Sequence, residues 1–331
     1  MMANLRAGLV GLGMMGRHHA RNLRAIDGVD LVAVADAQGD PHGLAGDLPV
    51  LPDVHALLEQ GLDYVVVAAP TMFHEEIGIA IAEAGVAALI EKPLAKTLDG
   101  ARLLVDAFST RGLVAAVGHI ERYNPALQQL RARLEAGELG ELYQVVTRRQ
   151  GPFPARIADV GVVKDLASHD IDLTAWVTQR DYEWVAARSV FKAGREYEDM
   201  VSATCSLTGG LMSNHLVNWL TPTKERLTAV TGEKGMFVAD TLTADLSFYA
   251  NASVQQTWDD LARFRGVAEG DVTRFAFPKQ EPLRTEHERF RDAVLGKESD
   301  IVTLEQGAQV VRVCEAMIES ARTNAFVDVR P

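Results

Sequence analysis

The first 120 residues carry their apolar residues in short uninterrupted runs, and a segment with helical periodicity follows most of these runs. Short apolar strands that alternate with helices are typical of a parallel sheet covered by helices on both faces. Residues 5–26 are predicted to form a strand followed by a helix. Further strands are predicted within 29–37, 62–71, 86–93 and 113–119, and further helices within 75–85 and 97–112. The pattern therefore predicts a doubly wound parallel sheet.

Beyond residue 120 the pattern changes to long segments in which apolar and polar residues alternate. Such segments indicate a large, mostly antiparallel sheet. They are residues 142–150, 183–194, 200–209, 211–221, 226–235 and 236–241, and helices are expected within 124–137, 164–177, 281–296 and 304–324. The predicted fold class is α/β, with a doubly wound domain at residues 1–121 and an α+β domain with a large open sheet at 122–331.

Glycines follow the first strand in the spacing G-x-G-x-x-G. They are Gly11, Gly13 and Gly16, with Met14 and Met15 between the last two. The first glycine permits a tight turn, the second lets the backbone approach a pyrophosphate, and the third lets helix and strand pack closely. These five residues are candidates for dinucleotide binding, and a glycine turn without a ligand is the alternative.

Asp36 ends the second strand, 20 residues after Gly16. A carboxylate at this position hydrogen-bonds the adenosine ribose hydroxyls of a dinucleotide and repels a 2′-phosphate. Ala37, Gln38 and Gly39 supply no arginine that would bind such a phosphate. NAD is therefore expected rather than NADP.

The loops after the third and fourth strands should line the cofactor crevice, because ligands bind at the carboxyl ends of parallel strands. Pro70, Thr71 and His74 are candidates in the first of these loops, and Glu91 and Lys92 in the second. His74 is equally well explained as a residue that starts a helix. Pro93 favours an extended backbone at Lys92, so this lysine is expected to point into the crevice.

The segment 159–172 places Asp165, His169 and Asp172 on one face of an otherwise apolar helix. Oxidation of an alcohol requires a base and a group that stabilises the developing alkoxide. His169 can be the base, Asp165 can orient the substrate or share the proton, and Lys92 can donate to the reacting oxygen. The alternative is that Asp165 caps or forms a salt bridge and that His169 is a core histidine.

Composition narrows the function classes. The chain of 331 residues has a net charge of −12 and is 47% hydrophobic, which argues against nucleic-acid and membrane-surface binding. No signal peptide or membrane span is evident, and the two cysteines, Cys205 and Cys314, lack metal-ligand spacing and are expected to be buried thiols. A cytoplasmic enzyme without a metal is therefore expected.

Five segments together resemble the glucose–fructose oxidoreductase/inositol dehydrogenase family (Gfo/Idh/MocA) over nearly the whole chain. They are GLVGLGMMGRHHARNL (8–23), VAVADA (32–37), AAPTMFH (68–74), EKPLA (91–95) and DLASHDIDL (165–173). The resemblance implies a Rossmann domain with bound nicotinamide cofactor and a second domain that often forms the contact of a homodimer or homotetramer. It also implies Lys92, Asp165 and His169 as the catalytic group of an NAD-dependent sugar or nucleotide-sugar dehydrogenase.

Within this family, residues 118–127, 151–172 and 218–240 resemble the branch of UDP-N-acetylglucosamine 3-dehydrogenases. That resemblance implies oxidation of the 3-hydroxyl of a UDP-N-acetylhexosamine to a ketone. The alternatives are an inositol or simple-sugar dehydrogenase and a non-catalytic NAD-binding regulator.

A UDP-sugar carries two phosphate charges, so basic residues should lie near its site. Candidate substrate-binding residues are Arg122, Tyr123, Asn124, Arg149, Arg156, Trp219, Lys224 and Arg226, accompanied by Arg148 and Lys164. The basic residues are equally well explained as solvated charges, and Trp219 as a core residue.

Overall fold

A computed structural model describes residues 4–153, 160–251, 254–255 and 268–330. The chain divides into two compact units. Of the described residues, the first unit contains 4–123, 160 and 281–315, and the second contains 124–153, 161–251, 254–255, 268–280 and 316–330. The predicted domains place residues 281–315 with the second half of the chain, whereas in the structure they pack with the first.

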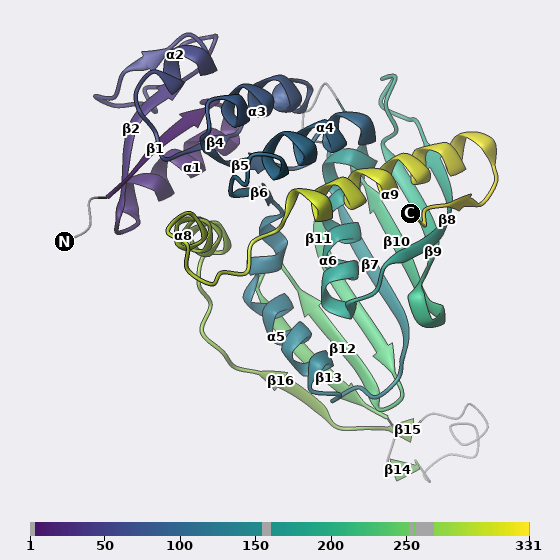
Figure 1. Cartoon of the computed structure of the whole chain (residues 1–331). Coiled ribbons are helices and arrows are strands. Elements are labelled where there is room, and N and C mark those ends of the chain that lie inside the picture. Colours follow the sequence, from purple (N-terminus) through teal and green to yellow (C-terminus); the bar gives the residue numbers. More distant parts are fainter. Residues whose placement is uncertain (1–3, 154–159, 252–253, 256–267, 331) are drawn as a thin grey trace. The chain divides into compact units, whose positions relative to one another are not determined.

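The first unit is built on a six-stranded parallel sheet with the order β3-β2-β1-β4-β5-β6 (Figure 1). Its strands are β1 (Leu5–Val10), β2 (Val29–Ala35), β3 (Val50–Leu51), β4 (Tyr64–Val67), β5 (Ala87–Glu91) and β6 (Ala115–Gly118). The order reverses direction between β1 and β4, which is the position where doubly wound sheets bind ligands. The predicted doubly wound parallel sheet is confirmed.

Helices cover both faces of this sheet, and β4 shows why. Tyr64 and Val66 enter one apolar cluster, while Val65 and Val67 enter the other, because successive side chains of a strand point to opposite faces. The helical elements of the unit are α1 (Met14–Ala25), α2 (Val54–Leu58), η1 (Thr71–Phe73), α3 (His74–Glu83), α4 (Leu98–Ser109), η2 (Ile120–Tyr123), α8 (Pro282–Val294) and the first part of α9 (Leu304–Thr323). Thr97 caps α4 by accepting a hydrogen bond from the Gly100 amide at 3.1 Å.

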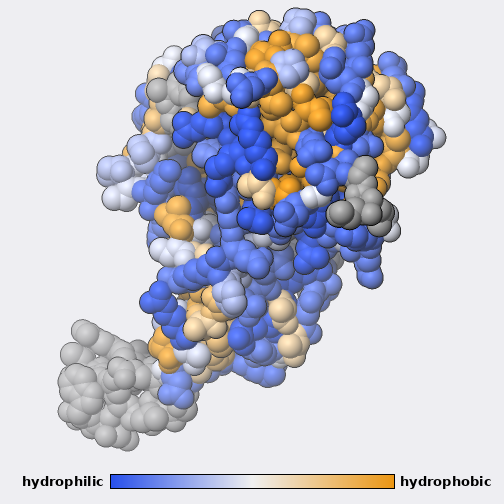
Figure 2. All heavy atoms as spheres, turned by 90° about the vertical axis from the view of Figure 1, so that its left-hand side faces the viewer, coloured by the Kyte–Doolittle hydropathy of each residue, from blue (hydrophilic) through white to orange (hydrophobic). Residues whose placement is uncertain are grey.

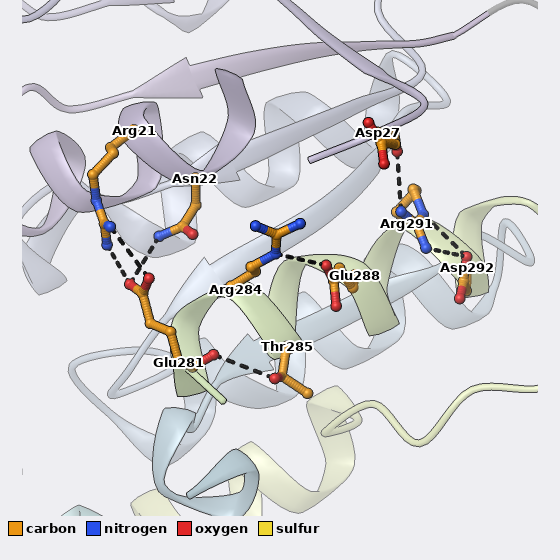
Figure 3. Close-up of polar contacts among 9 residues, drawn as sticks. All are labelled: Arg21, Asn22, Asp27, Glu281, Arg284, Thr285, Glu288, Arg291 and Asp292. Carbon is orange, nitrogen blue, oxygen red and sulfur yellow. Dashed lines mark hydrogen bonds and ion pairs between the residues drawn. The ribbon is translucent and has the colours of Figure 1, made fainter. Parts of the chain in front are cut away.

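Helix α8 joins the Rossmann sheet from far along the chain. Its Phe290 packs edge-on against Tyr64 with ring centroids 5.4 Å apart. Glu281, which precedes α8, forms an ion pair with Arg21 of α1, and Arg291 donates to the Asp27 carbonyl at 3.0 Å (Figure 3). Apolar packing and polar contacts at both ends therefore fix α8 beside α1.

The second unit contains a nine-stranded sheet with the order β16-β13-β12-β11-β7-β10-β9-β8-β17. Its strands are β7 (Leu142–Pro152), β8 (Tyr182–Val190), β9 (Met200–Leu207), β10 (Leu211–Asn218), β11 (Leu220–Gly232), β12 (Gly235–Asp240), β13 (Asp245–Ala250), β16 (Val272–Phe275) and β17 (Val327–Asp328). All neighbours are antiparallel except β7 and β10. The predicted large, mostly antiparallel sheet is confirmed.

Helices α5 (Pro125–Glu135) and α6 (Ser168–Thr178) lie against this sheet, with the turn η3 (Val163–Ala167) directly before α6 (Figure 1). Two short segments, β14 (Val254–Gln255) and β15 (Ala268–Glu269), pair with each other, and η4 (Thr208–Gly210) joins β9 to β10. The helix predicted at 164–177 thus exists and packs on the sheet.

Both cysteines are buried thiols, as the sequence predicts. Hydrophilic residues dominate the face of the molecule seen in Figure 2, and hydrophobic residues gather in the upper part of that view. Over the described ranges, no helix is both long enough and apolar enough to cross a bilayer.

Candidate active site

Each glycine of the loop after β1 has a different steric role. Gly11 has a φ of +95°, and a Cβ there would lie 2.6 Å from the Ala68 carbonyl oxygen. A Cβ on Gly16 would lie 2.0 Å from the carbonyl oxygen of Gly11, so only glycine lets α1 approach the loop this closely. A Cβ on Gly13 would meet no atom within 4 Å. Gly13 therefore faces open space, the side on which a ligand can approach the backbone.

The N-terminus of α1 begins at this open position. Gly13 is the N-cap residue, and no described side chain caps the helix. Met14 and Met15 occupy its first turn, and the Met14 side chain is 58% exposed. Uncapped N–H groups and the helix dipole favour an anionic group here, which fits the pyrophosphate of a dinucleotide.

Asp36 lies beside the same loop. Its Oδ2 accepts a hydrogen bond from the Leu12 amide at 2.7 Å, and its Oδ1 accepts one from the Gln38 amide at 2.8 Å. These bonds fix the carboxylate next to the glycine turn, and each oxygen keeps a further lone pair for a ribose hydroxyl. The Asp36 carboxylate, as hydrogen-bond acceptor, and the open glycine loop fit NAD.

His74 connects the two later loops rather than facing solvent. It is buried, with Nδ1 3.0 Å from the Pro93 carbonyl oxygen and Nε2 2.9 Å from that of Ala69. Burial lowers its pKa, so the imidazole is neutral and donates to one carbonyl at a time. This geometry favours a structural role in which His74 holds the loop of Pro70 and Thr71 next to the E-K-P segment.

Two residues of that loop were missed in the sequence. Met72 and Phe73 in η1 are 57% and 43% exposed, at the carboxyl end of β4, where doubly wound sheets bind their ligands. Their exposure makes them further candidates for contact with the cofactor. The segment T-M-F-H alone could not indicate that the histidine turns inward while the methionine and phenylalanine remain exposed.

Lys92 follows the last residue of β5 and is half-buried. The preceding Glu91 is buried, and its Oε2 accepts a hydrogen bond from the Lys92 amide at 3.0 Å. Its Oε1 lies 2.9 Å from Nε2 of His19 in α1. The Glu91 carboxylate therefore forms hydrogen bonds inside the first unit and fixes the backbone amide of Lys92.

Asp165 and His169 lie on consecutive turns in the second unit. Asp165 is buried in η3, which is a π-turn, and His169 is half-buried in the first turn of α6. π-turns are rare and frequently occur at functional sites. Lys92 belongs to the first unit, and Asp165 and His169 belong to the second.

Glu198 supports the start of this helical segment and was not found from the sequence. Its carbonyl oxygen accepts from the Val162 amide at 3.0 Å, and its Oε1 accepts from the Val163 amide at 3.0 Å. A Cβ on Gly161 would lie within 2.3 Å of the Glu198 carboxyl group, so glycine is required at this position. Burial raises the pKa of Glu198, against the lowering effect of the Val163 amide.

Strands β7 and β11 bring several predicted substrate residues together. Arg149 and Arg226 are paired in the sheet register. Arg149 is buried in an ion pair with Asp170 at 2.7 Å, and Arg226 donates to the Gln150 carbonyl at 2.7 Å. The Lys224 side chain is exposed.

Two more candidates nearby are Arg148 and Lys164. Arg148 forms an ion pair with Glu225 at 3.0 Å, and Lys164 is half-buried in η3. Arg156 lies outside the described residues. Acidic partners therefore offset part of the positive charge of these strands.

Trp219 is buried among side chains of its own unit. Its ring meets Phe153 edge-on with centroids 5.6 Å apart, and the Arg195 guanidinium lies 4.9 Å from the Trp219 ring centroid. Asp199 holds Arg195 by an ion pair at 3.1 Å. These contacts favour the core interpretation of Trp219.

Arg122, Tyr123 and Asn124 are buried and make contacts within the fold. Arg122 donates to Gln306 at 2.8 Å, and the Tyr123 hydroxyl donates to the Asp300 carbonyl at 3.2 Å. Asn124 caps α5 by accepting from the Ala126 amide at 3.0 Å. A group of three or more residues suited to hold a metal is absent from the described part of the chain.

The chain matches two family descriptions. Residues 5–119 match "Oxidoreductase family, NAD-binding Rossmann fold", and residues 127–238 match "GFO/IDH/MocA C-terminal domain". Both matches agree with the positions of the parallel and the mostly antiparallel sheet.

Among curated proteins, UDP-N-acetylglucosamine 3-dehydrogenase of Acidithiobacillus ferrooxidans is 35% identical over 216 residues, which cover 64% of this chain and 66% of the relative. The scyllo-inositol 2-dehydrogenase (NAD(+)) of Bacillus subtilis is 32% identical over 183 residues, covering 52% and 54%. The chain thus spans about half to two thirds of the length of these relatives. The solved structure of UDP-N-acetylglucosamine 3-dehydrogenase GnnA from A. ferrooxidans superposes with a TM-score of 0.84 at 27% identity, covering 97% of this chain and 99% of that chain.

Proposed function

Because this chain belongs to the GFO/IDH/MocA oxidoreductase family, we propose that it oxidises a secondary hydroxyl of a sugar to a ketone, with NAD as hydride acceptor. The proposal rests on three residues that the first unit places at one edge of its sheet. An open glycine at the N-terminus of α1, Asp36 beside it and Lys92 at the end of β5 occupy the ligand-binding edge of a doubly wound sheet.

Gly11, Gly13, Gly16 and Asp36 would hold the cofactor, with Met14 and Met15 in the same helical turn. When bound, NAD supplies the acceptor for the hydride that leaves the carbinol carbon. Asp36 would receive the ribose hydroxyls, and its negative charge disfavours NADP.

The proton of the hydroxyl must go to the protein. His169 takes it as general base, because a neutral imidazole has a nitrogen lone pair that can accept a proton. Lys92 donates a hydrogen bond to the reacting oxygen and stabilises the negative charge that develops there. Asp165, one turn before His169, orients the substrate hydroxyl.

For the substrate, we favour the 3-hydroxyl of a UDP-N-acetylhexosamine. The similarity to UDP-N-acetylglucosamine 3-dehydrogenase supports this choice, and so does the exposed Lys224 beside Arg226, which suits a diphosphate. We also favour a homodimer or homotetramer, as the family resemblance implies.

A second candidate is an inositol or simple-sugar dehydrogenase. The similarity to scyllo-inositol 2-dehydrogenase favours it. Such substrates carry no phosphate, so Lys224 and Arg226 would have no charge to bind. A non-catalytic NAD-binding regulator is disfavoured, because Lys92, Asp165 and His169 are all present.

The test is absorbance of reduced nicotinamide after mixing the protein and NAD with UDP-N-acetylglucosamine, UDP-N-acetylglucosaminuronate or myo-inositol. A parallel set contains a 2-oxoacid as acceptor, so that a cofactor retained through turnover is also detected. We expect reduction with a UDP-sugar and its loss in Lys92→Ala. Reduction with myo-inositol alone would reject the nucleotide-sugar assignment and support the second candidate.

A further inference from the structure

A chain of buried polar side chains leads from α8 to the residue before Lys92. Nε2 of His287 lies 2.9 Å from Nδ1 of His19, and Nε2 of His19 lies 2.9 Å from Oε1 of Glu91. These side chains belong to α8, α1 and β5, and their residues are 1%, 0% and 7% exposed. All of them lie in the first unit.

The protonation of these side chains depends on the carboxyl group of Glu91, which lies at one end of the hydrogen-bonded series. Burial alone would raise the pKa of Glu91, but the hydrogen bond and charge of His19 and the charge of Lys92 lower it, so Glu91 is ionised. A carboxylate only accepts, so His19 donates from Nε2. Burial and the neighbouring His19 lower the pKa of His287 well below its usual value, so His287 is neutral. The ring nitrogens His19 Nδ1 and His287 Nε2 share the remaining hydrogen bond, in which one ring donates and the other accepts.

The other carboxylate oxygen of Glu91 forms a hydrogen bond with the backbone of Lys92. Oε2 accepts from the Lys92 amide at 3.0 Å. On the far side, a Cβ on Gly118 of β6 would lie 3.2 Å from the Glu91 Cα and carboxyl group. The carboxylate therefore sits tightly between His19, Gly118 and the Lys92 peptide.

The position of His287 is itself fixed by the packing of α8 on α1. Arg21 pairs with Glu281, Asn22 donates to Glu281 at 3.4 Å, and Arg291 donates to the Asp27 carbonyl (Figure 3). These contacts leave α8 little freedom to move away from His19. His287 is thus connected to the backbone of Lys92 through three hydrogen bonds.

We propose that His287 and His19 are positioning residues for Lys92. They hold the Glu91 carboxylate in one orientation, and Glu91 holds the amide of Lys92. The proposal rests on the proposed function, in which Lys92 stabilises the reacting oxygen. Supporting residues of this kind fix the geometry of the group that touches the substrate, as outer partners do for metal ligands.

The test compares His287→Leu with His287→Gln. Leucine fills space without a polar atom, whereas the glutamine amide can still donate a hydrogen bond to His19 or accept one from it. Both variants are compared with the wild type by hydrogen exchange of the Lys92 amide, measured by NMR, and by turnover. Thermal unfolding and the NAD dissociation constant are measured on the same samples.

We expect His287→Leu to exchange the Lys92 amide about 10-fold faster, with little change at Leu89 in the same strand. Its kcat should fall about 10- to 100-fold while the substrate KM and NAD affinity change little. His287→Gln should restore both properties to within about 3-fold of the wild type. A folded His287→Leu with unchanged exchange at Lys92, or a His287→Gln as impaired as the leucine variant, would overturn the proposal.

Gly118→Ala provides a second perturbation if His287→Leu does not fold. Its methyl group must displace the Glu91 carboxyl by a few tenths of an ångström, so the Lys92 amide should again exchange faster, and unchanged exchange would count against the proposal. The two hypotheses fail separately. A wild type that binds NAD but oxidises no alcohol rejects the proposed function, whereas the exchange measurement decides the positioning role without any turnover.

Discussion

The glycine loop shows how far single residues can be interpreted from spacing. The pattern G-x-G-x-x-G predicts a tight turn at Gly11 and close packing at Gly16, and the positive φ and the near contacts show both. The pattern also predicts a ligand beside Gly13. The open space there is compatible with that prediction, which binding measurements must test.

Alanine substitutions separate these roles. Gly16→Ala should destabilise the fold by about 1–3 kcal/mol or more, because its methyl group meets the backbone of Gly11. Gly13→Ala should change stability by only about 0.5 kcal/mol and weaken NAD binding about 10-fold or more, since its methyl group occupies the ligand side. Urea unfolding and titration calorimetry measure the two effects. Equal NAD affinity in Gly13→Ala and the wild type would place the cofactor elsewhere.

Glu286 is a buried carboxyl that no sequence pattern marked. Both of its carboxyl oxygens lack a hydrogen-bond partner among the described residues. Burial and the charge of Glu91 raise the pKa of Glu286 well above 4.5. The folded protein therefore retains this proton at pH values where the unfolded chain loses it, and stability should fall as pH rises above about 4.5.

Glu286→Gln removes that proton from the balance. The variant should gain stability relative to the wild type as pH rises, by up to about 1.4 kcal/mol per pH unit until the folded-state pKa is reached. Urea unfolding of both proteins at pH 5, 6 and 7 gives the difference. A difference that stays constant over this range would show that Glu286 does not keep its proton.

Among the helices and strands, the helix predicted at 164–177 is present, but it begins with a π-turn. Glu198, which lies just before β9, accepts a hydrogen bond from the amide of Val163 in this turn. Sequence periodicity locates a helix and its apolar positions. It does not show which distant residue accepts from the N–H groups at the start. Gly161 was the local signal, since a glycine before a helix can make room for a partner.

Glu198→Ala should lower the free energy of unfolding by about 1–2 kcal/mol, the cost of losing a helix cap. Glu198→Gln should cost much less, because its amide oxygen can still accept from Val163. Chemical denaturation of both variants provides the comparison. If the two substitutions were equally costly, the charge of Glu198, rather than its hydrogen bond, would be what matters.

The buried pair Arg149–Asp170 joins β7 to α6. Arg149→Met leaves the Asp170 charge without this partner and should cost about 3–5 kcal/mol, whereas Arg149→Met combined with Asp170→Leu should recover much of the loss. Denaturant unfolding measures both. A stable Arg149→Met with a raised KM for the UDP-sugar would instead support the substrate-binding role predicted from the sequence.

For the molecule as a whole, alternation of strands and helices was enough to predict both sheets. The parallel pairing of β7 with β10 was not predictable, because it joins strands about 70 residues apart in the sequence. Strands β13 and β16 were missed as well. Register and partner choice depend on long-range packing, which local periodicity does not contain.

The placement of α8 illustrates the same limit. Its amphipathic pattern predicts a helix, and its position late in the chain suggests the second domain. In the structure its Phe290 and His287 enter the core of the first unit, against Tyr64 and His19. A sequence shows the apolar face of a helix but not the sheet that this face covers.

In the proposed reaction, a hydride passes from the carbinol carbon of the sugar 3-hydroxyl to NAD. The most direct measurement uses UDP-N-acetylglucosamine deuterated at C3, with mass spectrometry of the reduced cofactor and of the sugar product. We expect one deuterium in the reduced nicotinamide, a 3-keto sugar that has lost it, and neither product in Lys92→Ala. Oxidised sugar without deuterium in the cofactor, or no oxidation by a protein shown to bind both NAD and the UDP-sugar, would contradict the proposed reaction.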